Sequence, residues 1–297
     1  MVNQKEIRVK IGSTKKTMKI TSAMKLVAAA KVNKMQKKLL ATRPYSAKVT
    51  ELFNNLVTSL DSDDMENYPL LKAKTEINTV LLLVISSDRG LCGAYNASII
   101  KAAIKEIQVL QEAGKQVQLI TVGRKAKVAF SKAIYKAQGV ELIESFTNLS
   151  SMPTNEEAAL ITNKAIELYL QGKVDQVKII TTKFVSLVNS YVETHDFLPV
   201  QTASQNGSKA EPYVIYDPNV QTLINTLTPM YIENRVYQSM QESTTSELAA
   251  RMTAMSNATN NARDVIKKLT LAYNKARQAS ITQEISEIVG GAAALSS

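Results

Sequence analysis

The stretch LAARMTAMSNATNNARDVIKKLTLAYNKA, residues 248–276, decides the fold of this chain. Its apolar and small residues recur in alternating steps of four and three, which is the spacing of a coiled-coil seam. The seam consists of Leu248, Met252, Met255, Thr259, Ala262, Ile266, Leu269, Tyr273 and Ala276. Thr259 and Ala262 are small for core positions, so a partner helix can approach closely there. The segment therefore predicts a long helix that pairs with a second helix.

A matching helix is predicted at the other end of the chain, over residues 3–58. Ala, Lys, Leu and Met dominate this segment, which favours helix. Pro44 is expected to kink the helix near residues 42–43, because proline lacks an amide donor and its ring clashes with the preceding turn. One narrow apolar stripe runs through Ile7, Ile11, Met18, Met24, Ala28, Met35, Leu39, Leu52 and Leu56. The two stripes bury each other if residues 3–58 and 218–288 pair as antiparallel helices.

The middle of the chain alternates short apolar runs with helical patterns. The runs, which are typical of strands covered on both faces, occupy residues 79–86, 116–122 and 176–184. The helical patterns occupy residues 94–113, 124–135 and 155–171. A last run at 187–200 follows after a short connection and predicts an antiparallel partner strand. The predicted fold class is therefore α/β, with a long antiparallel coiled coil of the terminal helices and a central Rossmann-like domain that contains a mixed sheet.

These patterns divide the chain into five segments. The expected division is an N-terminal helix (1–60), a linker (61–76), the central α/β domain (77–200), a Ser/Gly-rich linker with a short following segment (201–217) and a C-terminal helix (218–297). Gly290 and Gly291 are expected to end or fray the last helix.

The net charge of +10 is concentrated at one end of the chain. Residues 1–60 hold thirteen Lys and Arg against Glu6 and Glu51, a net charge of +11, and the rest of the chain is close to neutral. Such a block is compatible with a solvated face, a nucleic-acid or membrane surface, or an acidic protein partner.

The sequence offers little chemistry for catalysis. With a single Cys92 and a single His195, neither an internal disulfide nor a Cys/His metal cluster can form. The segment Ser87–Asn96 follows a strand and opens a helix, where glycine-rich loops often hold phosphate. It lacks the spacing of a dinucleotide or phosphate loop, so a structural strand–turn–helix connection is favoured over a nucleotide site. We expect no catalytic residues, no cofactor and no metal.

Several segments, spread over nearly the whole chain, resemble one family. Residues 17–36 (TMKITSAMKLVAAAKVNKMQ), 87–96 (SDRGLCGAYN) and 281–294 (ITQEISEIVGGAAA) are similar to motifs of the gamma subunits of F-type ATP synthases. Residues 249–252 and 273–280 are similar to the shaft of these proteins. The resemblance implies a rotor shaft that lies inside a ring of alpha and beta subunits. It also implies an α/β foot on the membrane-embedded c-ring, beside the epsilon subunit.

The resemblance also implies which residues meet the partners. Contacts between rotor and stator fall on Met24, Lys25, Arg251, Gln278, Thr282 and Glu284, and contacts with the c-ring fall on Tyr216 and Asp217. Lys25 would face an acidic loop of beta, which gives the basic block a partner. Met24 is also explained by packing between helices, and the others by ordinary solvated helix positions. The paired cysteines of some photosynthetic relatives are absent, so control through a disulfide within the chain is excluded.

The implied function is torque transmission between the c-ring and the catalytic ring during proton-driven ATP synthesis, with catalysis in the beta subunits. The implied location is peripheral, on the cytoplasmic face of a bacterial inner membrane. Two other classes stay open from the residues alone. One is a basic coiled-coil scaffold that binds nucleic acid, although the aromatic residues of such surfaces are missing. The other is a small nucleotide-binding α/β enzyme flanked by helices.

Overall fold

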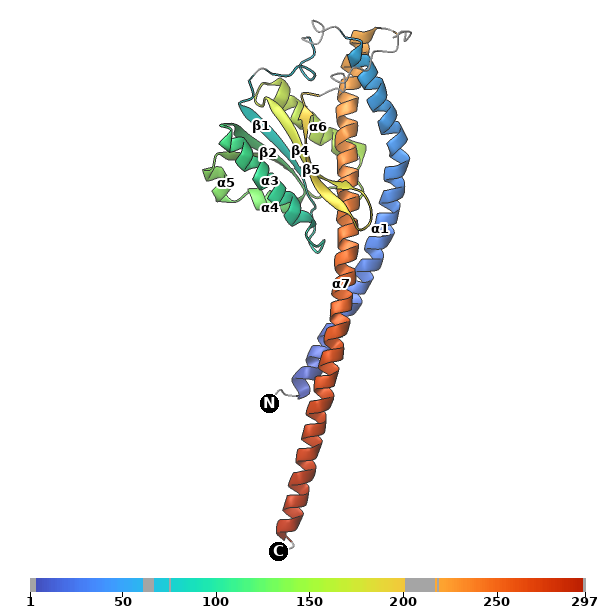
Figure 1. Cartoon of the computed structure of the whole chain (residues 1–297), viewed down its shortest axis with the longest axis vertical. Coiled ribbons are helices and arrows are strands. Elements are labelled where there is room, and N and C mark those ends of the chain that lie inside the picture. Colours follow the sequence, from blue (N-terminus) through green and yellow to red (C-terminus); the bar gives the residue numbers. More distant parts are fainter. Residues whose placement is uncertain (1–3, 61–66, 75, 201–216, 218, 296–297) are drawn as a thin grey trace. The chain divides into compact units, whose positions relative to one another are not determined.

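The computed structural model describes residues 4–60, 67–74, 76–200, 217 and 219–295 (Figure 1). The chain divides into two compact units. The helical unit comprises residues 1–29 and 251–297, and the α/β unit comprises residues 30–250. Two long helices, α1 (Gln4–Thr58) and α7 (Val220–Leu295), each contribute to both units.

The α/β unit contains a mixed sheet, as the sequence predicts. Its strands are β1 (Thr79–Ile85), β2 (Gln116–Val122), β3 (Val140–Phe146), β4 (Gln176–Phe184) and β5 (Ser190–Leu198). They are arranged in the order β3-β2-β1-β4-β5. Strands β3, β2, β1 and β4 run parallel to one another, and β4 and β5 form an antiparallel hairpin. Helices lie between the parallel strands in sequence, because parallel strands need a crossover connection.

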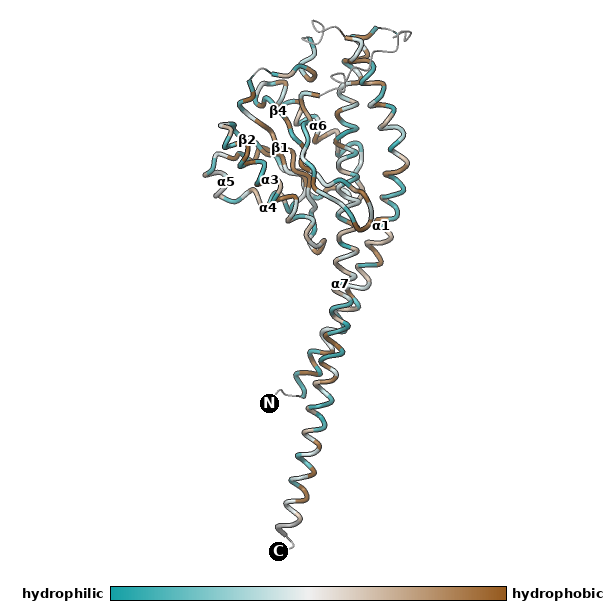
Figure 2. The backbone as a smooth tube through the Cα atoms, in the orientation of Figure 1, coloured by the Kyte–Doolittle hydropathy of each residue, from teal (hydrophilic) through white to brown (hydrophobic). Residues whose placement is uncertain are grey.

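Helices cover both faces of this sheet. They are α3 (Tyr95–Glu112), α4 (Arg124–Phe130), α5 (Ala133–Ala137) and α6 (Asn155–Leu170), besides α1 and α7. Strand β1 sends Leu81, Leu83 and Ile85 into a core with α6, α1 and α7, and the alternate residues Val80, Leu82 and Val84 into a core with α3. This explains the uninterrupted apolar run of β1, which Figure 2 shows as a hydrophobic stretch of the backbone.

Within the α/β unit, α1 and α7 run antiparallel. Phe53 stacks on Tyr231 with ring centroids 4.2 Å apart. Further along the pair, the Ser46 hydroxyl donates to Asn234 Oδ1 at 3.2 Å, and the Thr42 hydroxyl donates to Gln241 Oε1 at 3.0 Å. Along these three contacts the residue numbers decrease on α1 and increase on α7, so the two helices are antiparallel. A small apolar cluster of Val32, Met35, Leu39, Phe184, Leu248 and Ala249 follows.

In the helical unit, the predicted seam faces the N-terminal helix. The hydroxyls of Thr21 and Thr259 form a buried hydrogen bond of 2.8 Å, and Ile7, Ala28 and Met255 are buried beside this line. Seam residues from Ala262 to Ala276 are partly buried, whereas the side chains of residues 277–292 are all exposed. The seam therefore ends near Ala276, and α7 continues as an exposed helix.

The structure corrects several details of the sequence prediction. Helix α7 continues through Gly290 and Gly291 to Leu295 instead of ending there. Leu52 is 49% exposed, and its neighbour Phe53 takes the core position, because the stripe drifts by one residue along a helix of this length. The helical pattern at 124–135 is split into α4 and α5. Strand β3 was not predicted, because Glu141 and Glu144 hide its apolar pattern at the edge of the sheet.

Candidate functional site

The candidate contact residues of α1 lie in the helical unit. Met24 and Lys25 are half-buried, one turn beyond Thr21, whose hydroxyl bonds with Thr259. Their neighbours Leu26 and Val27 are 68% and 57% exposed, although both are apolar. Met24 and Lys25 therefore lie next to two apolar side chains that α7 leaves exposed.

The candidate contact residues of α7 fall into two groups along the helix. Arg251 is half-buried and lies near the paired part. Gln278, Thr282 and Glu284 are exposed and lie beyond the end of the seam. The Thr282 hydroxyl donates to the Gln278 carbonyl at 2.9 Å, so these two residues share one face, and Glu284 accepts from the Ser280 hydroxyl at 3.1 Å. With about 1.5 Å of rise per residue, Gln278 lies roughly 29 Å along the helix from Thr259.

The structure therefore does not bring the candidate residues together into one pocket. They form one group beside the Thr21–Thr259 contact and a second group on the exposed part of α7. Such spacing is typical of an extended protein interface rather than of a catalytic site. Of the two residues assigned to the c-ring, Tyr216 lies outside the described residues, and Asp217 is exposed.

In the loop between β1 and α3, the polar groups of Ser87 and Asp88 form hydrogen bonds within the chain. The Ser87 amide donates to Asn96 Oδ1 at 3.1 Å, and the Ser87 hydroxyl donates to the Arg89 carbonyl at 2.8 Å. Asp88 accepts the Arg124 amide at 2.8 Å, so a carboxylate of the chain occupies the first turn of α4. These contacts support the structural interpretation of Ser87–Asn96 over a phosphate site.

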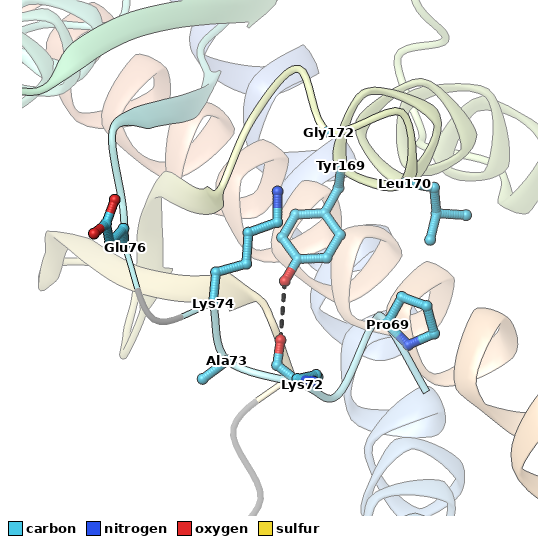
Figure 3. Close-up of a pocket in the computed structure, with 8 residues that line it drawn as sticks. All are labelled: Pro69, Lys72, Ala73, Lys74, Glu76, Tyr169, Leu170 and Gly172. Carbon is cyan, nitrogen blue, oxygen red and sulfur yellow. Dashed lines mark hydrogen bonds between the residues drawn. The ribbon is translucent and has the colours of Figure 1, made fainter. Parts of the chain in front are cut away.

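A shallow pocket of about 790 Å³ lies beside the amino end of β1 (Figure 3). It is lined by Pro69, Lys72, Ala73, Lys74, Glu76, Tyr169, Leu170 and Gly172. The Lys74 ammonium is 2.9 Å from Asp175 and 5.2 Å from the Tyr169 ring centroid, and Tyr169 donates to the Lys72 carbonyl. Nucleotide sites of such sheets lie at the carboxyl ends of the strands. The pocket therefore lies at the opposite ends of the strands from a nucleotide site, and the charge of Lys74 is already paired with Asp175.

The described residues contain no group of three or more His, Cys, Asp and Glu side chains placed to hold a metal ion. No helix among them combines the length and hydrophobicity needed to cross a bilayer.

A charged interface between the β4–β5 hairpin and α7 was not found from the sequence. Lys183 on β4 forms an ion pair of 2.9 Å with Glu242, whose side chain is only 4% exposed. Burial raises the pKa of Glu193 on β5, the positive charge of Lys183 opposes this shift, and Glu242 adds to it. No sequence signal identifies this interface, because its members are distant in the chain and Glu242 lies within a helix that is polar on several sides.

His195 on β5 faces the same interface and gives a pH-dependent prediction. Burial, followed by the positive charges of Arg235 and Lys183, lowers its pKa to about 4, and Asp196 opposes the shift. As the pH falls through 6.5, the unfolded chain therefore binds a proton at His195 while the folded chain does not. His195 leaves the free energy of unfolding unchanged above pH 6.5 and lowers it progressively as the pH falls from 6.5 towards 4. Because the ring is only partly buried, we expect a loss of about 1–2 kcal/mol in the free energy of unfolding.

The measurement is urea unfolding of the full chain at pH 7 and pH 4.5, compared with a His195→Gln variant. The variant should lose less stability over this interval than the unmodified chain. Identical losses in the two proteins would mean that His195 does not contribute to acid sensitivity.

Comparisons with known proteins agree with this geometry. A family model described as ATP synthase matches residues 3–295. The ATP synthase gamma chain of Synechococcus sp. (strain JA-3-3Ab) is 42% identical, and the match covers 99% of this chain and 100% of the relative. That of Symbiobacterium thermophilum is 42% identical over 99% of this chain and 98% of the relative. The Synechococcus alignment spans 321 positions, so that relative carries segments that this 297-residue chain lacks.

Solved structures show the same similarity. The central stalk and c-ring structure of the Tetrahymena thermophila mitochondrial ATP synthase contains a chain 27% identical to this one, with a TM-score of 0.58 over 80% of this chain and 99% of that one. A chain of the Euglena gracilis mitochondrial ATP synthase gives a TM-score of 0.66 at 20% identity, over 98% and 94% of the two chains, which supports the fold. From the family match and the relatives that share its full length, we conclude that this chain belongs to the ATP synthase gamma chain family.

Proposed function

We propose that this chain is the central rotor shaft of an F-type ATP synthase and transmits torque between a membrane c-ring and the catalytic ring. The observation that carries the proposal is the paired α1–α7 shaft, which ends in an exposed single helix, within a chain that matches gamma chains over its full length. Apolar Ile281, Ile285 and Ile288 on the surface of the exposed helix support an enclosing partner.

In this proposal, the two groups of candidate residues contact the stator at two levels of the shaft. Met24, Lys25 and Arg251 face the lower level of the alpha and beta subunits, where Lys25 and the basic N-terminal block attract acidic side chains of beta. Gln278, Thr282 and Glu284 face the same ring further along α7. The contacts differ from one beta subunit to the next as the shaft turns, and this difference biases each subunit between its conformations.

We assign the foot to residues 77–200 together with 201–217. Tyr216 and Asp217 are the proposed contacts with the c-ring, beside the epsilon subunit. This arrangement holds the chain peripherally at the membrane through the c-ring. The two sequence relatives at 42% identity, from Synechococcus and Symbiobacterium, are bacterial, which favours the cytoplasmic face of a bacterial inner membrane. The coupling of proton flow to ATP synthesis belongs to the whole complex, and catalysis belongs to beta.

Purification from the native membrane tests this proposal. A tagged copy of the chain should co-purify with alpha, beta, epsilon and c subunits in a complex that hydrolyses ATP. Recovery of the chain with nucleic acid, or as a lone protein, would contradict it.

The isolated chain should show no steady hydrolysis of ATP. The polar groups Ser87 and Asp88 of its glycine-rich loop form hydrogen bonds within the chain. Its pocket lies at the amino end of β1, opposite the carboxyl ends where nucleotides bind. The measurement is phosphate release by the purified chain alone, with the assembled complex as the positive control. Turnover that rises in proportion to pure chain, and that is lost on mutation of its own residues, would overturn the non-catalytic assignment.

A further inference from the structure

One segment of α7 is buried although it is almost entirely polar. Residues 241–247 include Gln241, Glu242, Ser243, Thr245, Ser246 and Glu247, whose exposed fractions range from 0% to 7%. We call these six residues the polar belt. Apolar residues of α7 precede the belt at Val236 and Met240 and follow it at Leu248 and Ala249. The belt therefore interrupts what could have been a continuous apolar contact.

The polar belt is bonded to three different elements of the α/β unit. From α1, the Thr42 hydroxyl donates to Gln241 Oε1 at 3.0 Å. From β4, the Lys183 ammonium lies 2.9 Å from Glu242 Oε1. From α3, the Tyr95 hydroxyl forms a buried hydrogen bond with the Ser243 hydroxyl. Just before the belt, the Thr181 hydroxyl on β4 donates to the Ser239 carbonyl at 3.4 Å.

The polar belt is not an arrangement that maximises stability. Gln241 Nε2 and Ser246 Oγ have no hydrogen-bond partner among the described residues. A buried ion pair such as Lys183–Glu242 is often matched or exceeded in stability by apolar residues of similar volume. Polar side chains at these positions are therefore better explained by a property other than folding free energy.

That property is resistance to twisting. Apolar contacts depend on buried area and have little directional preference, so two apolar surfaces can slide or turn past each other while staying together. Hydrogen bonds weaken steeply when their angle is distorted, so they oppose rotation of one partner against the other. Bonds from three sides of one helix oppose rotation about its axis in either direction.

We propose that the polar belt is the torsional coupling between α7 and the rest of the α/β unit (residues 30–250), with Thr42, Lys183 and Tyr95 as its positioning residues. This inference rests on the proposed rotor function, because torque that enters at the foot has to pass into α7. In the apolar clusters on either side, the contacts keep the two parts together. In the belt, the contacts fix their angle.

An apolar version of the belt tests this inference in the assembled complex. The variant carries Lys183→Met, Glu242→Met, Tyr95→Phe and Ser243→Ala. The matched control carries Lys178→Met and Glu106→Met, which removes a 2.7 Å ion pair of the same unit that links β4 to α3 and does not touch α7. The catalytic ring is fixed to a surface, a bead is attached to the α/β domain, and the angular fluctuation of the bead is recorded without ATP.

The belt variant should melt within about 5 °C of the unmodified complex, because apolar residues of similar volume replace the polar ones. Its angular variance should rise by about two-fold or more, because directional bonds have been lost. The control variant should leave the variance unchanged. Equal variance in the belt variant and the unmodified complex would overturn the inference.

A second variant keeps the test independent of packing changes. Lys183→Glu and Glu242→Lys each place like charges side by side, whereas the double exchange restores an opposite pair. The double exchange should recover most of the stiffness that either single variant loses, and an angular variance as large as in the single variants would overturn the inference.

Failure of the rotor proposal is a different result. If the unmodified chain does not rotate with ATP at all, the rotor proposal fails, whereas rotation with unchanged angular variance in the belt variant overturns only the inference about the polar belt.

Discussion

A disulfide between the shaft and the catalytic ring should stop sustained ATP hydrolysis. Cys92 is first replaced by alanine, so that no native thiol competes. A cysteine beside Arg251 is then paired with one on the facing beta subunit at a spacing that suits a disulfide. Oxidation should lower multi-turnover hydrolysis by about ten-fold or more, in proportion to cross-link yield, because a rotor that is fixed to its stator cannot pass through successive states. Reduction should restore the activity.

The control is a disulfide within the shaft. Thr21 and Thr259 are suited to it, because their hydroxyl oxygens are 2.8 Å apart in the structure. Cysteines at these positions join α1 to α7 and leave the pair free to turn as one body. This link should change hydrolysis by less than about two-fold. Loss of activity with both links would indicate local damage, and full ion-coupled turnover with the shaft-to-ring link would rule out rotation of this segment.

The same lock placed near residues 278–282 should have a smaller effect. Side chains 277–292 are all exposed, so no helix in the described part of the chain packs against α7 there. A single helix can unwind or swivel with a small loss of packing, whereas the paired region near Arg251 cannot. The difference between the two locks therefore measures how firmly each level of the shaft is held.

Substitution of Gly123 should be the most damaging small change in the α/β unit. This residue connects β2 to α4 with φ 92° and ψ 141°, a conformation that is almost restricted to glycine. A Cβ atom at this position would lie 2.5 Å from the Ser86 carbonyl oxygen and 2.7 Å from its carbon. Both are backbone atoms at the end of β1, so the clash cannot be relieved by rotating a side chain. Gly123→Ala should lower the free energy of unfolding by about 3–5 kcal/mol.

Gly139 provides the matched control. It also has a positive φ of 75°, but a Cβ atom there would meet nothing within 4 Å. Gly139→Ala should therefore lower the free energy of unfolding by only about 1–2 kcal/mol, from the backbone conformation alone. Urea unfolding of the two full-length variants measures the difference. Equal losses would show that the contact with Ser86 does not determine the need for glycine at position 123.

Much of the fold was predictable because its signals are local. The runs at 116–122 and 176–184 became β2 and β4 with the predicted bounds, since a strand covered on both faces needs consecutive apolar residues. The seam from Leu248 faces α1 because its four-three spacing fixes one face of the helix. Strand β3 was missed because an edge strand carries charged residues such as Glu141 and Glu144.

The candidate site was less predictable, for a physical reason. Met24, Lys25, Gln278 and Thr282 came from resemblance to a family, because their residue types alone do not distinguish a contact with a partner from an ordinary helix position. The Lys183–Glu242 pair depends on contacts between residues 59 positions apart. Its residue types alone are indistinguishable from those of a solvated helix face.

Direct observation of rotation tests the central claim most directly. The catalytic ring is fixed to a surface, and a bead is attached to the α/β domain of this chain through a single introduced cysteine in the Cys92→Ala background. On addition of ATP, the bead should turn in one direction through many complete revolutions, at a rate that follows ATP concentration. A complex that hydrolyses ATP at its full rate while the bead only fluctuates about one angle would contradict the assignment of this chain as the rotor.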